Sequence, residues 1–142
     1  MDIQSSAFDF ASEYLDSKAL RNLGFLQVGD NVRISRNSTI IGVENIKIGS
    51  NVRIDSYNVI IARRGTLSIG DNVHIENCKI GPHVSIGNNT KLVNSVVTNS
   101  IIQTNVKVNN CNINNSMVGN FAELNGANGS LSISDYSTIQ NS

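Results

Sequence analysis

The sequence predicts an all-β fold in which short parallel strands wind into stacked coils. Aliphatic residues recur at steps that are nearly all five or six residues long, and a second series of mostly small or β-branched residues lies two positions before them. Residues two apart point to the same side of a strand, so each repeat supplies one large and one small inward side chain. Gly, Asn and Asp residues between the repeats favour tight corners.

The spacing of the aliphatic residues indicates that three strands close each coil into a triangular prism. The step from the first face to the second is six residues each time, which a chance pattern would not maintain. We expect about six coils, which at ~4.8 Å per coil give a prism roughly 30 Å long. The pairs that define this register are Val28 and Ile34, Ile48 and Ile54, Ile69 and Ile75, Ile86 and Leu92, Ile102 and Val108, and Val118 and Leu124.

Length and composition are those of one small domain with no bulk charge. The chain has 142 residues and a formal net charge of zero, with 15% charged residues. Bulk attraction to nucleic acid or to an anionic membrane is therefore not supported. No signal peptide or membrane-spanning stretch is recognisable, so we expect a soluble cytoplasmic protein. Cys78 and Cys111 fit no metal or disulfide pattern, and we expect free thiols.

Residues 1–25 are expected to form a capping helix and a turn, and residues 26–142 the prism. Ser5 and Ser6 can cap a helix at its N-terminus. That helix would cover the open first coil, whose unpaired edge would otherwise invite association. Its apolar residues at approximately helical spacing are Phe8, Ala11, Tyr14, Leu15, Ala19 and Leu20. Insertions at Gly42–Lys47, Ala62–Thr66 and Asn125–Ser130 are expected to bulge at corners, the first two at the same corner of successive coils.

The hexapeptide spacing resembles that of the left-handed parallel β-helix family from Gln27 onward, and the left hand follows from this resemblance. The first half, with SKALRNLGFLQVGDNVRI and LSIGDNVHI, resembles bacterial hexapeptide-repeat sugar O-acyltransferases. In that family a histidine follows the IG-x-x-V segment, and here it is His74. The second half, with GPHVSIGNNTKLVNSVVTNS, resembles the β-helical C-terminal tail of sugar-phosphate nucleotidyltransferases. That tail is an oligomerisation and regulatory element.

Outward residues of the second face are expected to stack into a predominantly basic column. They are Arg33, Arg53, His74, Lys91, Lys107 and then Glu123. Like charges on neighbouring strands repel, so an anionic ligand is one possible compensation. The alternative is that Asp55 and Glu76 neutralise the column. Each lies two residues after a member of the column, so its side chain points outward on the same face.

The acyltransferase resemblance implies a catalytic role for His74. As general base it would take a proton from a sugar hydroxyl or amine that attacks an acyl-CoA thioester. Asp55 and Glu76 are the acidic neighbours expected to orient its ring. Arg63 and Arg64 at the bulged corner, with Lys91, are candidates for binding the CoA phosphates. His74 is otherwise an outward surface histidine.

His83 falls at a corner, where GPHVSIG is a common way of turning a coil in this fold, and we expect its role to be structural. No metal is expected. The zinc site of the β-helical carbonic anhydrases needs three imidazole ligands, and this chain contains two histidines.

Two functional hypotheses follow. The leading one is an acyl-CoA-dependent acyltransferase, with acetyl-CoA or another acyl-CoA as co-substrate, acting on a sugar or nucleotide-sugar in polysaccharide biosynthesis. Exposed apolar residues on the first and third faces indicate a contact surface, and a homotrimer is the family habit. The alternative is a non-catalytic β-helix that serves as an oligomerisation or ligand-binding module.

Overall fold

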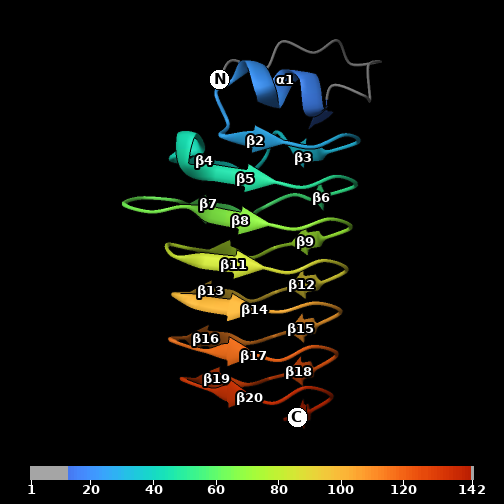
Figure 1. The fold of residues 1–142 in the computed structure, drawn as a ribbon, viewed down its shortest axis with the longest axis vertical. Helices are drawn as coiled ribbons and strands as arrows, with labels where there is room; N and C mark the ends of the chain where they lie inside the picture. Colours follow the sequence, from blue (N-terminus) through green and yellow to red (C-terminus); the bar gives the residue numbers. More distant parts are fainter. Residues whose placement is uncertain (1–12, 142) are drawn as a thin grey trace.

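The computed structural model describes residues 13–141 as a three-sided prism of stacked strands (Figure 1). The chain makes about seven turns of a left-handed parallel β-helix, which is the predicted fold with about one turn more than the six expected. Helix α1 (Ser17–Asn22) lies at the N-terminal end. None of the described helices is long and apolar enough to span a membrane.

Each face of the prism is one sheet, and successive turns supply its successive strands. The first face contains β2 (Gln27–Val28), β5 (Ile46–Ile48), β8 (Leu67–Ile69), β11 (Val84–Ile86), β14 (Ser100–Ile102), β17 (Met117–Val118) and β20 (Ser132–Ile133). The second face contains β1 (Tyr14–Leu15), β3 (Arg33–Ser35), β6 (Arg53–Ile54), β9 (His74–Glu76), β12 (Lys91–Val93), β15 (Lys107–Asn109), β18 (Glu123–Asn125) and β21 (Thr138–Gln140). The third face contains β4 (Thr39–Ile41), β7 (Val59–Ile61), β10 (Lys79–Ile80), β13 (Val96–Thr98), β16 (Asn112–Asn114) and β19 (Asn128–Gly129).

The core is the interior of the prism, filled by the two predicted inward series. Large aliphatic side chains such as Ile75 and Leu92 are fully buried. The small series also contains buried hydroxyls, which bond to the backbone: Ser95 Oγ donates to the Val93 carbonyl (2.8 Å) and accepts from the Cys111 amide (3.1 Å). No buried side-chain polar atom of the described residues lacks a partner. Cys78 and Cys111 are both free and buried.

Asparagine is frequent because the corners need left-handed backbone. At the corner between the first and second faces, Asn31, Asn51 and Asn72 have φ values of 56°, 60° and 57°. Asparagine tolerates this conformation better than most residues. The side chains also bond from coil to coil, with Asn31 Nδ2 donating to Asn51 Oδ1 at 2.9 Å.

The N-terminal end differs from the predicted long helix. Tyr14 and Leu15, expected to be helical, form β1, which pairs antiparallel with β3. Helix α1 is short and is capped by Asp16, whose side chain accepts a hydrogen bond from the Ala19 amide at 2.9 Å. Pairing with the open edge of β3 favours the extended conformation over the helical one. Ser5, Ser6, Phe8 and Ala11 lie outside the described residues.

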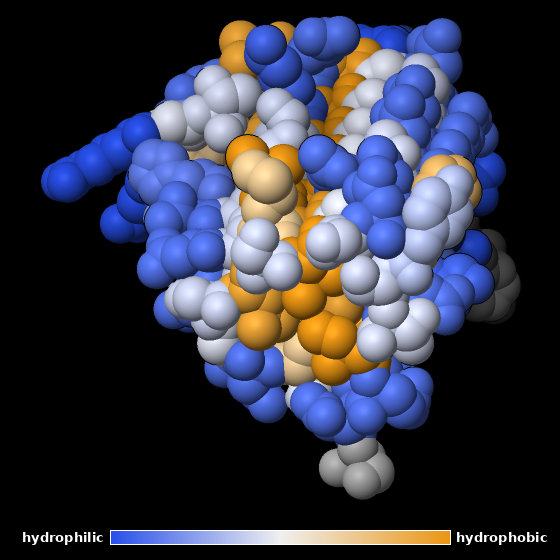
Figure 2. Space-filling view, turned by 60° about the horizontal axis from the view of Figure 1, so that its bottom comes forward, coloured by the Kyte–Doolittle hydropathy of each residue, from blue (hydrophilic) through white to orange (hydrophobic). Residues whose placement is uncertain are grey.

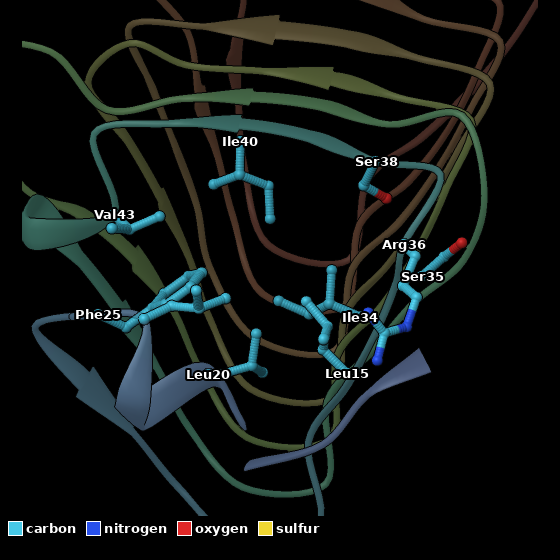
Figure 3. Close-up of a pocket in the computed structure, with 10 residues that line it drawn as sticks. Leu15, Leu20, Phe25, Ile34, Ser35, Arg36, Ser38, Ile40 and Val43 are labelled. Carbon is cyan, nitrogen blue, oxygen red and sulfur yellow. The ribbon is translucent and has the colours of Figure 1, made fainter. Parts of the chain in front are cut away.

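An apolar cavity of about 320 Å³ lies at this end, between α1 and the first coil (Figure 3). Its walls include Leu15 from β1, Leu20 from α1 and Ile34 from β3, all directed toward the same space. Arg36 and Ser38 lie at its rim. The short helix therefore covers the core only in part.

Two of the three predicted insertions are corner loops. Gly42 begins a loop that contains the 3-10 helix η2 (Val43–Asn45), and Ala62–Thr66 forms the loop between β7 and β8. Both lie at the corner between the third and first faces. The third prediction was wrong: Asn125–Ser130 contains β19, which pairs with β16. Gly129 takes the place of an inward aliphatic residue there, so the repeat is hidden in the sequence.

The predicted exposed apolar residues lie on the expected faces. Ile101 and Met117 are neighbours on the first face and are 45% and 50% exposed. Ile41, Val59, Ile61 and Val96 lie half-buried on the third face. Figure 2, in which the C-terminal end is turned forward, shows a band of hydrophobic surface running across that end. Leu131, Ile133 and Ile139 of the last coil are only partly buried against the core.

Gly24 and Gly42 have similar positive φ values but different surroundings. Substituting each by alanine therefore distinguishes the cost of left-handed backbone from the cost of a steric clash. Gly42 (φ 83°) sits against the Ala62 carbonyl, which an added Cβ would strike, whereas a Cβ on Gly24 (φ 95°) would meet nothing within 4 Å. Gly24→Ala should lower the free energy of unfolding by about 1 kcal/mol, the cost of left-handed backbone alone. Gly42→Ala should lower it by about 3 kcal/mol or more. Urea denaturation of both variants measures this, and equal losses would contradict the predicted backbone clash.

Candidate active site

The predicted column exists on the second face. Parallel pairing places Arg33 beside Arg53, Arg53 beside His74, and His74 beside Lys91. The column continues through Lys107 to Glu123, whose side chains form an ion pair at 3.7 Å. Alternation along each strand turns these side chains outward, because the residue that follows each one is an inward aliphatic.

His74 and Asp55 form a hydrogen-bonded pair in this column. His74 Nε2 lies 2.8 Å from Asp55 Oδ2. The Asp55 side chain is only 13% exposed, while that of His74 is 35% exposed. Asp55 follows Ile54 at the end of β6, and His74 begins β9 in the next coil, so the stacking register brings the two together.

The other carboxylate oxygen of Asp55 is held by two donors. Arg53 Nε donates to Asp55 Oδ1 at 2.8 Å, and Tyr14 Oη donates to the same oxygen at 2.7 Å. The Arg53 guanidinium also lies over the Tyr14 ring, 5.6 Å from its centroid. Asp55 thus neutralises part of the basic column, as the alternative interpretation of the sequence proposed.

The electrostatics keep Asp55 ionised. Burial by itself would raise the pKa of this carboxyl, but the hydrogen bonds from Tyr14, Arg53 and His74 together outweigh burial and hold the pKa below its usual value. The same contact with Asp55, together with burial, raises the pKa of Tyr14. An ionised carboxylate can only accept, so the proton of neutral His74 must sit on Nε2. Nδ1 is then unprotonated, and no described residue bonds to it.

Glu76 lies beside the pair without bonding to it. It is exposed, and its carboxylate lies within 4.8 Å of the functional atoms of Asp55 and His74. No described residue forms an ion pair with it. Because Asp55 and His74 already satisfy each other, the arrangement is that of a hydrogen-bonded pair with a free carboxylate nearby.

A cavity of about 540 Å³ opens next to this cluster. It is lined by Tyr14, Arg53, Asp55, Ser56, Tyr57, Glu76 and Asn77. Tyr57 is 76% exposed and adopts a φ of 68°, a conformation that is uncommon for a bulky residue. Rings, carboxylates, a hydroxyl and an amide together suit a polar organic ligand.

Of the residues predicted to bind the phosphates of coenzyme A, only Lys91 lies near His74. Lys91 adjoins His74 on β12. Arg63 and Arg64 are exposed in the β7–β8 loop, at the corner between the third and first faces. That corner does not border the second face, so one chain does not bring these arginines to His74. His83 lies at the same corner, with its ring against Gly65.

Tyr14 is the residue that sequence reasoning assigned to another role. It was expected to belong to the apolar face of a helix, yet its hydroxyl bonds to Asp55, 41 positions along the chain. Its distance from Asp55 in the sequence leaves no local signal for this contact.

Comparisons with known proteins agree with the resemblance expected from the sequence. No protein-family profile matches the chain. A dTDP-4-amino-4,6-dideoxy-D-glucose acyltransferase from Escherichia coli is 47% identical over 62 residues, which cover 44% of this chain. The match spans only 32% of that relative's length.

Solved structures share the fold over most of the chain. AntD, an N-acyltransferase from Bacillus cereus, in complex with dTDP and 3-hydroxybutyryl-CoA, superposes with a TM-score of 0.80 at 20% identity. A variant of AntD in complex with dTDP-4-amino-4,6-dideoxyglucose and coenzyme A gives a TM-score of 0.81, covering 89% of this chain and 84% of that one. The chain is therefore a left-handed β-helix that resembles sugar acyltransferases of the hexapeptide-repeat type.

The lowered pKa of Asp55 predicts a pH-dependent stability. Because the folded pKa lies below the unfolded one, Asp55 contributes stability that is fully present above the unfolded pKa of about 4 and is lost as pH falls through the folded pKa. Asp55→Asn should therefore be less stable than the parent at pH 7, and the gap should narrow in acid. Thermal melting of both proteins over a pH series measures the gap.

Asp30→Asn, at an exposed ion pair with Arg21, is the matched control. A gap that stays constant with pH would contradict the prediction.

Proposed function

We propose that this protein is an acyltransferase that moves an acyl group from coenzyme A to a nucleotide-linked sugar. The observation that carries the proposal is the His74–Asp55 pair, held at 2.8 Å on an outward face beside an open cavity. An oriented histidine with one unprotonated ring nitrogen is what general-base catalysis requires. In the alternative of a non-catalytic module, Asp55 would serve only to neutralise the basic column.

In the proposed reaction, His74 Nδ1 takes a proton from the acceptor while the acceptor attacks the thioester carbonyl carbon. A C–N or C–O bond forms, the C–S bond breaks, and the departing coenzyme A thiolate takes the proton from the His74 imidazolium, which returns to its neutral form. Asp55 stabilises the imidazolium that forms in between, because its carboxylate already faces Nε2. Arg53 and Tyr14 keep that carboxylate in place.

The acceptor we propose is an amine on a dTDP-linked deoxysugar. The support is the name of the Escherichia coli relative, a dTDP-4-amino-4,6-dideoxy-D-glucose acyltransferase, and the ligands bound to AntD. The cavity beside Asp55, the partner of His74, suits a sugar ring, since it offers aromatic rings together with Ser56, Glu76 and Asn77 as hydrogen-bonding groups. The acyl donor is acetyl-CoA or another acyl-CoA. We propose that the reaction takes place in the cytoplasm and that its product serves polysaccharide biosynthesis.

We further propose a homotrimer with the site at a cleft between neighbouring chains. Arg63 and Arg64 lie at the corner opposite the face that carries His74, so a neighbouring prism would have to supply them. There, with Lys91, they would bind the phosphates of coenzyme A. The exposed apolar residues Ile101 and Met117 provide a surface for such packing.

A thiol-release assay tests the activity. With acetyl-CoA or 3-hydroxybutyryl-CoA and a panel of amino- and hydroxyl-bearing dTDP-sugars, the parent should release free coenzyme A. His74→Ala should lower kcat by about 100-fold or more, since a general base contributes that much.

The control is His83→Ala, at the other histidine, which should retain the parental rate. Absence of turnover with every acceptor, or a His74→Ala variant as active as the parent, would refute the proposal. If coenzyme A also failed to raise the melting temperature, the non-catalytic module would be favoured.

Mixed oligomers test whether two chains share a site. His74→Ala lacks the base, and the double variant Arg63→Ala, Arg64→Ala lacks the proposed phosphate ligands. In an equal mixture of co-expressed chains, roughly a quarter of the interfaces of a cyclic trimer combine an intact histidine with an intact arginine pair. Activity at low acyl-CoA should then recover to about that fraction of the parental value. Lys18→Ala, on exposed α1, is a control for simple loss of positive charge. No recovery in verified mixed oligomers would exclude a shared site.

A further inference from the structure

The strand β1 brings Tyr14 to the candidate active site from outside the repeat. Tyr14 pairs with Ser35 and Leu15 pairs with Ile34, so β1 lies along the free edge of the second face. Successive residues of a strand point in opposite directions. Leu15 points into the apolar cavity beside Leu20 (Figure 3), and Tyr14 therefore points outward. Its hydroxyl extends past the first coil to Asp55 in the second.

The contacts divide the two oxygens of Asp55 between different partners. Oδ1 accepts from Tyr14 Oη at 2.7 Å and from Arg53 Nε at 2.8 Å, while Oδ2 lies 2.8 Å from His74 Nε2. The Arg53 guanidinium is held over the Tyr14 ring, and Arg53 Nη2 lies 3.5 Å from the Tyr14 hydroxyl. A second guanidinium nitrogen is thereby directed to Tyr14, and Arg53 contacts the carboxylate through Nε alone.

We propose that Tyr14 is a positioning residue for the acyl transfer, and that β1 is a strap that holds Asp55 with Oδ2 directed at His74. This inference rests on the proposed function. An arginine fork frequently binds a carboxylate through two parallel hydrogen bonds. Here Tyr14 occupies part of that fork and one lone pair of Oδ1. Without its hydroxyl, Arg53 is free to contact both oxygens of Asp55. Oδ2 would then be shared between Arg53 and His74, and the carboxylate could turn, which weakens the contact that sets the His74 tautomer.

The same geometry predicts the direction of a pH effect. The charged and titratable groups around Asp55 are Tyr14 from β1, Arg53 from β6, and His74 and Glu76 from β9. The Tyr14 hydrogen bond is one of the contacts that lower the pKa of Asp55. Its removal should raise that pKa, and the titration of the Asp55 carboxyl reports this directly.

Tyr14→Phe tests the proposal because it removes the hydroxyl and keeps the ring under Arg53. We expect kcat to fall by about tenfold, with KM for acyl-CoA changed by less than about twofold. Tyr136→Phe is the matched control: Tyr136 is exposed, stacks on Phe121 at the far end of the prism, and should give parental kinetics.

Nuclear magnetic resonance supplies a readout that does not depend on turnover. In the parent, the ring nitrogens of His74 should report the Nε2-protonated tautomer wherever the imidazole is neutral, and the Asp55 carboxyl should titrate below its usual range. In Tyr14→Phe, the tautomers should mix and the Asp55 titration should rise. If the parent has no activity, the proposed function fails while these spectra still decide whether Tyr14 positions the pair. Unchanged spectra in Tyr14→Phe would overturn the inference, and so would a loss of activity that only follows a loss of folded protein.

Discussion

The structure depends on one constraint, which is backbone pairing between successive coils in a constant register. Parallel strands stack about 4.8 Å apart, so every residue lies on its equivalent in the coil before. A shift of one residue would turn the whole inward set outward. The register therefore creates the core and the functional face together: it buries Ile54 and Ile75, and it sets His74 on Arg53. Asparagine corners keep this spacing possible, because they turn the chain within one or two residues.

The candidate site is a consequence of that stacking with one addition. Arg53 and Asp55 flank an inward residue and so share a face, and His74 arrives from the next coil at hydrogen-bonding distance. Repulsion along a column of cations is relieved at the level where a carboxylate is present. Tyr14 is the addition, since it comes from a strand that is no part of the repeat. The second coil therefore differs chemically from the other coils of the repeat, because β1, which is outside the repeat, contacts it through Tyr14.

Fold and chemistry carry different weight in assigning a function. The likeness to AntD at 20% identity establishes the left-handed β-helix and nothing about the reaction. The proposal instead rests on the oriented histidine and its surroundings. The separation of Arg63 and Arg64 from His74 is informative in the same way, because it requires a neighbouring chain if these residues serve a common ligand.

The sequence by itself determined the repeat, the three faces, the inward and outward residues, and the column in which His74 lies near Asp55. Each of these follows from periodicity, since pairing in register converts spacing along the chain into position in space. The tertiary structure alone decided that Tyr14 and Leu15 form a strand, that Asn125–Ser130 belongs to the repeat, and that both oxygens of Asp55 are occupied. A two-residue strand has almost no local preference and is stabilised by pairing with a distant edge. Periodicity carries no information about contacts of that kind.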